Sequence, residues 1–255
     1  MHTVHTNTMM DRQEREILLQ LSQLNTRALD LVCEGRNEDG EAMLSNCLAF
    51  ALQYLQMTAL SSTASACLCS ASSPPLSQDC SVHKTIGSRP RSSLMTLPFQ
   101  GVFSDDDFPM DSPHSWFCFY PFAMDVEGDS VHDLSVLLAM VSYNLAMIHH
   151  CVGFVESDFD RLLKARRLYE YATQHVAAAA STASSSDDSE DWPLLTLAVY
   201  NNLGHLASAF GDSEGIEICR NVMERGQHYV PKLPAVLERS LARAKQFLMT
   251  VAPAA

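Results

Sequence analysis

Proline divides this 255-residue sequence into long uninterrupted stretches. Seven of the eleven prolines lie between Pro74 and Pro121, and none occurs in residues 1–73, 122–192 or 194–230. Long helices avoid proline because it removes a backbone hydrogen bond and clashes with the preceding turn. The three proline-free stretches therefore predict an all-α protein in which each stretch forms an antiparallel helical hairpin.

The first stretch has the apolar spacing of two amphipathic helices. Apolar side chains recur every three or four positions in residues 9–34 and again after Gly35, and this spacing places them on one helix face. Gly35 ends the first helix, and Asn37 or Asp39 can cap the second. The first stripe is Ile17, Leu18, Leu21, Leu24, Ala28, Leu29 and Val32, and the second is Ala42, Met43, Cys47, Phe50, Ala51 and Tyr54. Residues 9–60 are predicted to form the first hairpin.

Signals at helix ends define two more hairpins. Ser130 and Asp133 resemble a capping box for a helix that Gly153 closes, and its partner helix is expected over residues 160–180. In the third stretch Gly211 ends a helix, and Asp212 or Ser213 can cap the next one. We therefore expect a second hairpin at residues 130–180, a third at residues 192–230 and a C-terminal capping helix at residues 231–251.

The segments between the hairpins differ in composition. Residues 61–93 are rich in Ser, Ala, Cys and Pro, and residues 181–191 contain only Ser, Thr, Ala, Asp and Glu. Both are predicted to be mobile linkers, because they bury too little apolar surface to offset the entropy of ordering. Residues 94–129 form an irregular insert whose aromatic side chains are expected to pack against the helices, with a short strand pair. Those side chains are Phe99, Phe103, Phe108, Trp116, Phe117, Phe119, Tyr120 and Phe122.

The second and third hairpins share a pattern. Tyr143-Asn144-Leu145-Ala146 falls on Asn201-Asn202-Leu203-Gly204 when Gly153 is aligned with Gly211. Small residues at such positions allow two helices to cross closely. Tyr200, Leu203, Gly204 and Gly211 in one pair, with Ala165, Tyr169 and Ala172 in the other, resemble the tetratricopeptide repeat. The resemblance implies a short solenoid of stacked antiparallel hairpins.

That resemblance also implies a function. Repeats of this kind present the first helix of each pair to a concave groove that holds a peptide or helix of a partner protein. The expected groove residues are Tyr143, Asn144, Met147, His150, Asn201, Asn202 and His205. Asparagine amides can grip a peptide backbone, although they can equally satisfy neighbouring helix ends. A further alternative is that the insert at residues 94–129 folds back and fills the groove.

Charge and cysteine content restrict the class of partner. The formal net charge of −13 would repel phosphate backbones and anionic lipids, so neither a nucleic acid nor a membrane partner is expected. The most apolar stretch, residues 134–148, is shorter than the roughly 20 residues of a membrane span. Eight cysteines without a disulfide spacing, and an N-terminus without a signal pattern, predict a cytoplasmic protein.

An enzyme is the alternative reading. His132-Asp133 resembles the metal-binding dyad of helical phosphohydrolases, with His150 and Asp158 downstream as further ligands for an ion that activates water. Asp133, however, already suits the capping box. Zinc is disfavoured, because adjacent His149 and His150 point about 100° apart on a helix, and the spacing from Cys67 to His83 does not fit a finger. We therefore expect a non-catalytic protein with no cofactor and no metal.

Overall fold

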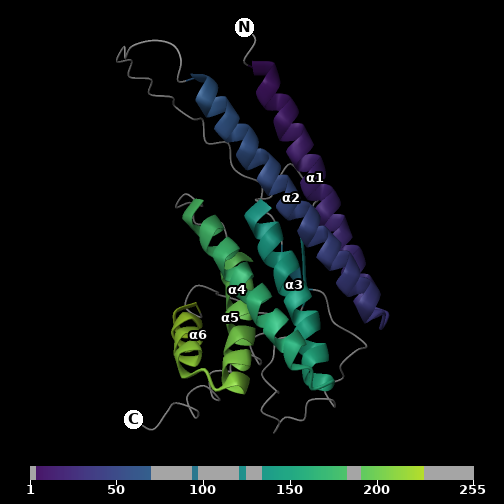
Figure 1. Cartoon of the computed structure of the whole chain (residues 1–255), viewed down its shortest axis with the longest axis vertical. Coiled ribbons are helices and arrows are strands. Elements are labelled where there is room, and N and C mark those ends of the chain that lie inside the picture. Colours follow the sequence, from purple (N-terminus) through teal and green to yellow (C-terminus); the bar gives the residue numbers. More distant parts are fainter. Residues whose placement is uncertain (1–3, 70–93, 97–120, 125–133, 183–190, 227–255) are drawn as a thin grey trace.

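The computed structural model of the chain describes residues 4–69, 94–96, 121–124, 134–182 and 191–226 (Figure 1). The described residues form six helices and two short strands. The helices are α1 Val4–Cys33, α2 Asn37–Cys69, α3 Leu134–Val155, α4 Phe159–Thr182, α5 Asp191–Phe210 and α6 Ser213–Gly226, and the strands are β1 Leu94–Thr96 and β2 Phe122–Met124.

The helices form three antiparallel pairs in chain order. Helix α1 packs on α2, α3 on α4 and α5 on α6, while α2 contacts α3 and α4 contacts α5 (Figure 1). The ends of α1 and α2 near residues 4 and 69 extend beyond the other four helices. The predicted all-α class and the stacked helical hairpins are therefore confirmed.

All three hairpins turn in the same way. Gly35, Ser157 and Gly211 adopt the left-handed conformation, with φ angles of 79°, 56° and 68°. In each turn, the amides of that residue and of the next one donate to carbonyls of the last helical turn at 2.8–3.4 Å. These hydrogen bonds satisfy carbonyl groups that would otherwise lack a donor at the helix end. Glycine adopts the left-handed conformation without strain. The predicted ends at Gly35 and Gly211 are confirmed.

The predicted end of α3 at Gly153 is wrong. Helix α3 continues to Val155. The residue in the left-handed conformation is Ser157, four positions after Gly153. Gly153 instead allows close packing, because a Cβ atom there would lie 2.7 Å from Cδ2 of Leu162 on α4. Aligning the turns at Ser157 and Gly211 places Asn144 opposite Ala198 rather than Asn202. The expected repeat overlay is therefore displaced by about one helical turn.

Like α3, two further helices extend past their predicted C-terminal ends. Helix α2 reaches Cys69, within the Ser- and Ala-rich stretch at residues 61–93, and α4 reaches Thr182. Alanine favours helix, and no proline occurs before Pro74, so α2 can continue. The remainder of both linkers, the capping box of Ser130 and Asp133 and the helix expected at residues 231–251 lie outside the described residues.

The apolar stripes of α1 and α2 form one side of the core. Leu18, Leu21, Ala28, Leu29 and Val32 of α1 are buried, as are Cys47 and Ala51 of α2. Three stripe positions differ from the prediction: Leu24 is 40% exposed, Phe50 is 39% exposed, and Ala42 is also exposed. The α1 residue buried in place of Leu24 is its polar neighbour Asn25.

Helix α3 lies at the centre of the fold. It contacts α1, α2 and α4, and almost every side chain from Leu134 to Cys151 is buried. By length and composition α3 could cross a membrane, but 94% of its most apolar 18-residue window is buried inside the protein. The core helix of a globular fold has these same properties.

The insert contributes a strand pair. Strand β1 pairs antiparallel with β2, with Leu94 opposite Met124 and Thr96 opposite Phe122. Strand β2 contacts α1 and α3. Phe122 is fully buried there, so one aromatic residue of the insert packs against the helices as predicted. The seven other aromatic residues of the insert lie outside the described residues.

Replacing Gly40 by alanine is expected to destabilise the protein by about 1–3 kcal/mol. The new Cβ would lie 2.9 Å from the carbonyl oxygen of Ala28 on α1, and closer still to Cγ2 of Val32. Helix propensity alone would give the opposite sign, a gain of about 1 kcal/mol. Urea unfolding measures the net effect. Ser45→Ala at an exposed position of α2 is the matched control, and a more stable Gly40→Ala protein would contradict the close approach.

Candidate functional site

The seven predicted groove residues are buried in the structure. Tyr143, Asn144, Met147, His150, Asn201 and Asn202 are fully buried, and His205 is 3% exposed. The expectation that they face an open concave surface is therefore wrong. The physical reason is that most of these polar side chains hydrogen-bond one another, or the main chain of β2, between the helices.

Asn25 of α1 and Asn144 of α3 hold the main chain of Phe122, and we call this pair the amide clamp. Oδ1 of Asn144 accepts the Phe122 amide hydrogen bond at 2.9 Å, and Nδ2 of Asn144 donates to the Phe122 carbonyl oxygen at 2.8 Å. Nδ2 of Asn25 donates to the same carbonyl oxygen at 3.1 Å. Nδ2 of Asn144 also donates to Oδ1 of Asn25 at 2.9 Å, which fixes both amides. The clamp thus uses both polar main-chain groups of one extended residue.

The side chain of Phe122 lies in an aromatic pocket beside the clamp. Its ring meets Tyr143 edge to face, with centroids 5.1 Å apart and planes at 69°. Tyr143 in turn lies 5.8 Å from the ring of Tyr169 on α4. The neighbours Pro121 and Ala123 are also buried. An edge-to-face aromatic pair adds about 0.5–1.5 kcal/mol beyond its buried area, so the pocket favours an aromatic side chain.

A second polar cluster links α3, α4 and α5, and we call it the interior network. Nε2 of His150 lies 2.9 Å from Nδ1 of His205, and Nδ1 of His150 lies 3.3 Å from the Tyr169 hydroxyl. Nδ2 of Asn202 donates to that hydroxyl at 3.0 Å and to the Tyr143 hydroxyl at 3.5 Å, and Asn201 donates to Asn202 at 3.2 Å. Tyr143 belongs to both the interior network and the aromatic pocket, so it links the network to the pocket beside the amide clamp.

The candidate metal ligands have separate partners in the described part of the chain. His150 faces His205, whereas Asp158 caps α4 by accepting from the amides of Asp160 and Arg161 at 3.0 and 3.1 Å. Among the described residues no three His, Cys, Asp or Glu side chains are arranged to hold a metal ion. His132 and Asp133 lie outside the described residues.

Cys47, Cys151 and Cys219 are not activated nucleophiles. Burial raises the pKa of Cys47 to about 12, and burial also raises the pKa of Cys219 to about 12. Complete burial places the pKa of Cys151 well above its ordinary value. A reactive cysteine requires the opposite shift, because the thiolate is the nucleophile.

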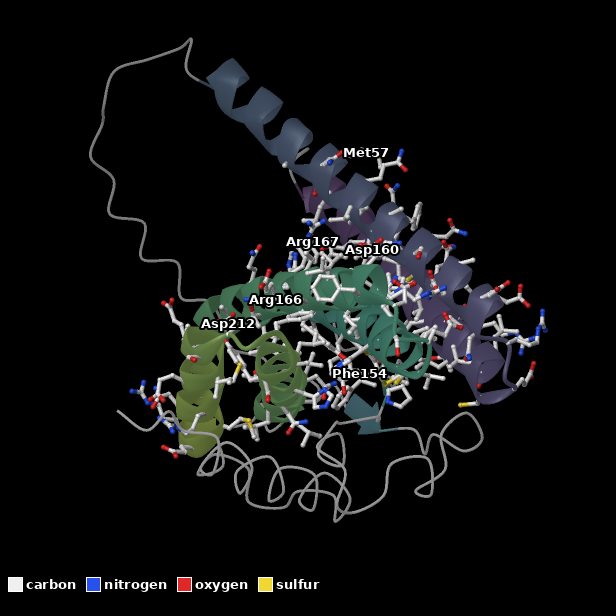
Figure 2. All side chains as sticks on the ribbon, turned by 60° about the horizontal axis from the view of Figure 1, so that its bottom comes forward. Met57, Phe154, Asp160, Arg166, Arg167 and Asp212 are labelled. Carbon is white, nitrogen blue, oxygen red and sulfur yellow. The ribbon has the colours of Figure 1, made fainter. Side chains whose placement is uncertain are left out.

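Ion pairs join the helical pairs outside the core. Arg166 of α4 contacts Asp212, which caps α6, with 2.6 Å between Nη2 and Oδ2 (Figure 2). The hydrogen bond from the Gly215 amide, followed by the one from Arg166, lowers the pKa of Asp212. Between the first and second helical hairpins, Nη1 of Arg161 on α4 lies 2.7 Å from Oε2 of Glu41 on α2. These two ion pairs link α4 to the start of α6 and α2 to α4.

His149 is buried beside the Glu41–Arg161 pair, and this burial is expected to make the stability depend on pH. Nε2 of His149 lies 3.7 Å from Oε1 of Glu41, and Nδ1 has no hydrogen-bond partner among the described residues. Desolvation lowers the pKa of His149, although Glu41 opposes the shift. The folded protein therefore binds fewer protons than the unfolded chain just below the ordinary pKa of about 6.5.

Stability is expected to fall as the pH drops through this window, because the unfolded chain gains a proton that folded His149 does not. His149→Gln removes this contribution, so its unfolding free energy should fall less steeply between pH 7 and pH 5 than that of the native chain. Urea unfolding at a series of pH values measures both slopes. Equal slopes would show that His149 titrates alike in both states.

Sequence reasoning missed Asn25. A signal was present, because Asn25 lies four positions after Leu21 and three before Ala28, within the buried stripe of α1. A polar residue at a stripe position must find a buried partner or lose about 1–3 kcal/mol. The partner of Asn25 is 97 residues away in the sequence, which local patterns do not reveal.

Comparison with known proteins gives no relative for this chain. No protein-family model matches it, and no curated protein and no solved structure matches it either. The stacked antiparallel helix pairs agree with the tetratricopeptide resemblance at the level of fold class, without a family match.

Proposed function

We propose that the protein is a non-catalytic interaction module that holds an extended segment of a partner protein on the first helices of its tetratricopeptide-like pairs. The observation that carries this proposal is the amide clamp, in which Asn25 and Asn144 hold both polar main-chain groups of Phe122. The partner is a protein or peptide, and the activity requires no cofactor.

The clamp is suited to extended backbone of any sequence. A carboxamide offers an acceptor and a donor at a spacing that matches the N–H and C=O groups of one residue. Asn144 uses both atoms on Phe122, and Asn25 adds a second donor to the carbonyl oxygen. Because these contacts involve only main-chain atoms, specificity has to come from the neighbouring aromatic pocket.

Charge narrows the class of partner. The chain has a formal net charge of −13, so a neutral or basic segment is favoured over an acidic one, a nucleic acid or an anionic membrane. Binding of a basic segment should weaken as salt is added. The proposal keeps the expected cytoplasmic compartment, where the thiols of Cys47, Cys151 and Cys219 would stay reduced.

The phosphohydrolase alternative is weaker for a specific reason. It needs His150 and Asp158 to join His132 and Asp133 around one ion, yet His150 pairs with His205 and Asp158 caps α4. Both residues thus have structural functions that account for their positions. An interaction module does not require these four residues to lie around one ion.

Selection of displayed random peptides on the folded chain tests the proposed function. Peptides that bind in the clamp should contain one residue whose N-methylation abolishes binding, because Oδ1 of Asn144 needs that N–H as a donor. Asn25→Ala should weaken the same peptides, whereas Asn46→Ala at an exposed position of α2 should not. Peptides that tolerate N-methylation at every position would contradict main-chain recognition.

A further inference from the structure

Building on this proposed function, we infer that the segment Pro121–Met124 is the resident occupant of the clamp, and that a partner enters by displacing it with an aromatic residue in extended conformation. The binding site would then be regulated by competition between an internal and an external segment. Three observations support this inference.

The first observation is the way in which β2 is attached. Within a sheet, strands bind one another through main-chain groups, but Phe122 is held by side-chain amides from α1 and α3. This is the contact set that an extended peptide ligand would make, and nothing in it depends on β2 belonging to the same chain. An external segment could therefore make the same hydrogen bonds.

The second observation is the pocket for the side chain. Phe122 is fully buried against Tyr143, whereas the polar contacts involve its main chain. All side-chain selectivity of the clamped position thus comes from an apolar, aromatic environment. An incoming segment must provide an aromatic residue at this position, since a smaller residue would leave a cavity beside Tyr143.

The third observation is the small size of the strand pair. Strands β1 and β2 have three residues each and form a two-stranded sheet. Such a sheet is at most marginally stable by itself in water. The helices therefore hold β2 in place. A competing segment that forms the same clamp hydrogen bonds and the same aromatic contact replaces most of the contacts that are broken when β2 leaves.

A peptide with the sequence of residues 120–126, Tyr-Pro-Phe-Ala-Met-Asp-Val, is the probe for this inference. Fluorescence anisotropy of the labelled peptide measures its affinity for the full-length native chain and for Phe122→Ala, which weakens the resident segment. We expect at least tenfold tighter binding to Phe122→Ala. The control is the same peptide with alanine at the position of Phe122, which should bind neither protein.

Two further variants keep the result interpretable. Met95→Pro disrupts the pairing of β1 with Ala123 and leaves the clamp intact, so it should also bind the peptide more tightly than the native chain does if Phe122→Ala fails to fold. Adding Asn25→Ala to either variant should weaken the gain, because one clamp donor is lost. Circular dichroism confirms that each protein is folded before binding is measured.

The outcomes separate this inference from the proposed function. If the peptide binds the native chain as tightly as Phe122→Ala, the resident segment does not compete and the inference fails, while peptide holding stands. If the peptide binds neither folded variant but the displayed peptides above still require a free N–H, the clamp has a different side-chain preference and the inference again fails. If both experiments show no binding, the proposed function fails as well.

Discussion

Replacing Asn144 by leucine is expected to lower the free energy of unfolding by about 2–5 kcal/mol, far more than a typical surface substitution. Leucine keeps the volume of the side chain but removes every hydrogen bond of the amide. The Phe122 amide loses its acceptor, and Oδ1 of Asn25 loses its donor. Each buried group left without a partner costs about 1–3 kcal/mol. Urea unfolding followed by circular dichroism measures the loss.

Two further variants identify the cause of that loss. Asn144→Asp keeps an oxygen for the Phe122 amide but cannot donate to the Phe122 carbonyl when ionised, so it should also be destabilised. Asn46→Leu on the exposed face of α2 should stay within about 0.5 kcal/mol of the native chain. Native stability of Asn144→Leu would mean that the clamp contributes nothing, and the proposed site would have no energetic basis.

The helix ends at Gly35 and Gly211 were predictable because their signals are local. Glycine in the left-handed conformation and an acidic residue directly after it define the turn at Gly211 and Asp212, and both act as expected. The same turn geometry at Ser157 was not predictable, because serine seldom adopts this conformation without help from its surroundings. The end of α3 was predicted at Gly153 instead, although the small size of Gly153 serves to let Leu162 of α4 pack closely against α3.

The burial of the site depends on contacts that local patterns do not encode. The sequence overlay singled out Asn144 and Asn202 as polar residues on first helices, but it aligned them in the wrong register and could not place β2 over Asn144. That contact joins residues 22 positions apart, and the one with Asn25 joins residues 97 apart. A polar residue on an apolar stripe predicts a buried partner without identifying it. Here the partner is the main chain of the insert.

Tyr169→Ala is expected to be the second large effect, a loss of about 3–5 kcal/mol. Tyr169 of α4 is fully buried, and its ring lies 5.8 Å from both Tyr143 and His150. Truncation would leave a cavity where the second helical pair meets the third. Chemical unfolding measures the loss, and Gln174→Ala on the exposed face of the same helix is the control.

Tyr169→Phe separates packing from hydrogen bonding in this effect. Phenylalanine keeps the ring, but it removes the hydroxyl that accepts from Nδ2 of Asn202 at 3.0 Å and faces Nδ1 of His150 at 3.3 Å. A single hydrogen bond contributes about 0.5–1.5 kcal/mol, so this variant should retain most of the stability that Tyr169→Ala loses. If both variants lost the same amount, the interior network rather than aromatic packing would hold α4 against α5. The position of α3, which carries Asn144 of the clamp, would then depend on that network, because Tyr143 of α3 contacts both Phe122 and Asn202.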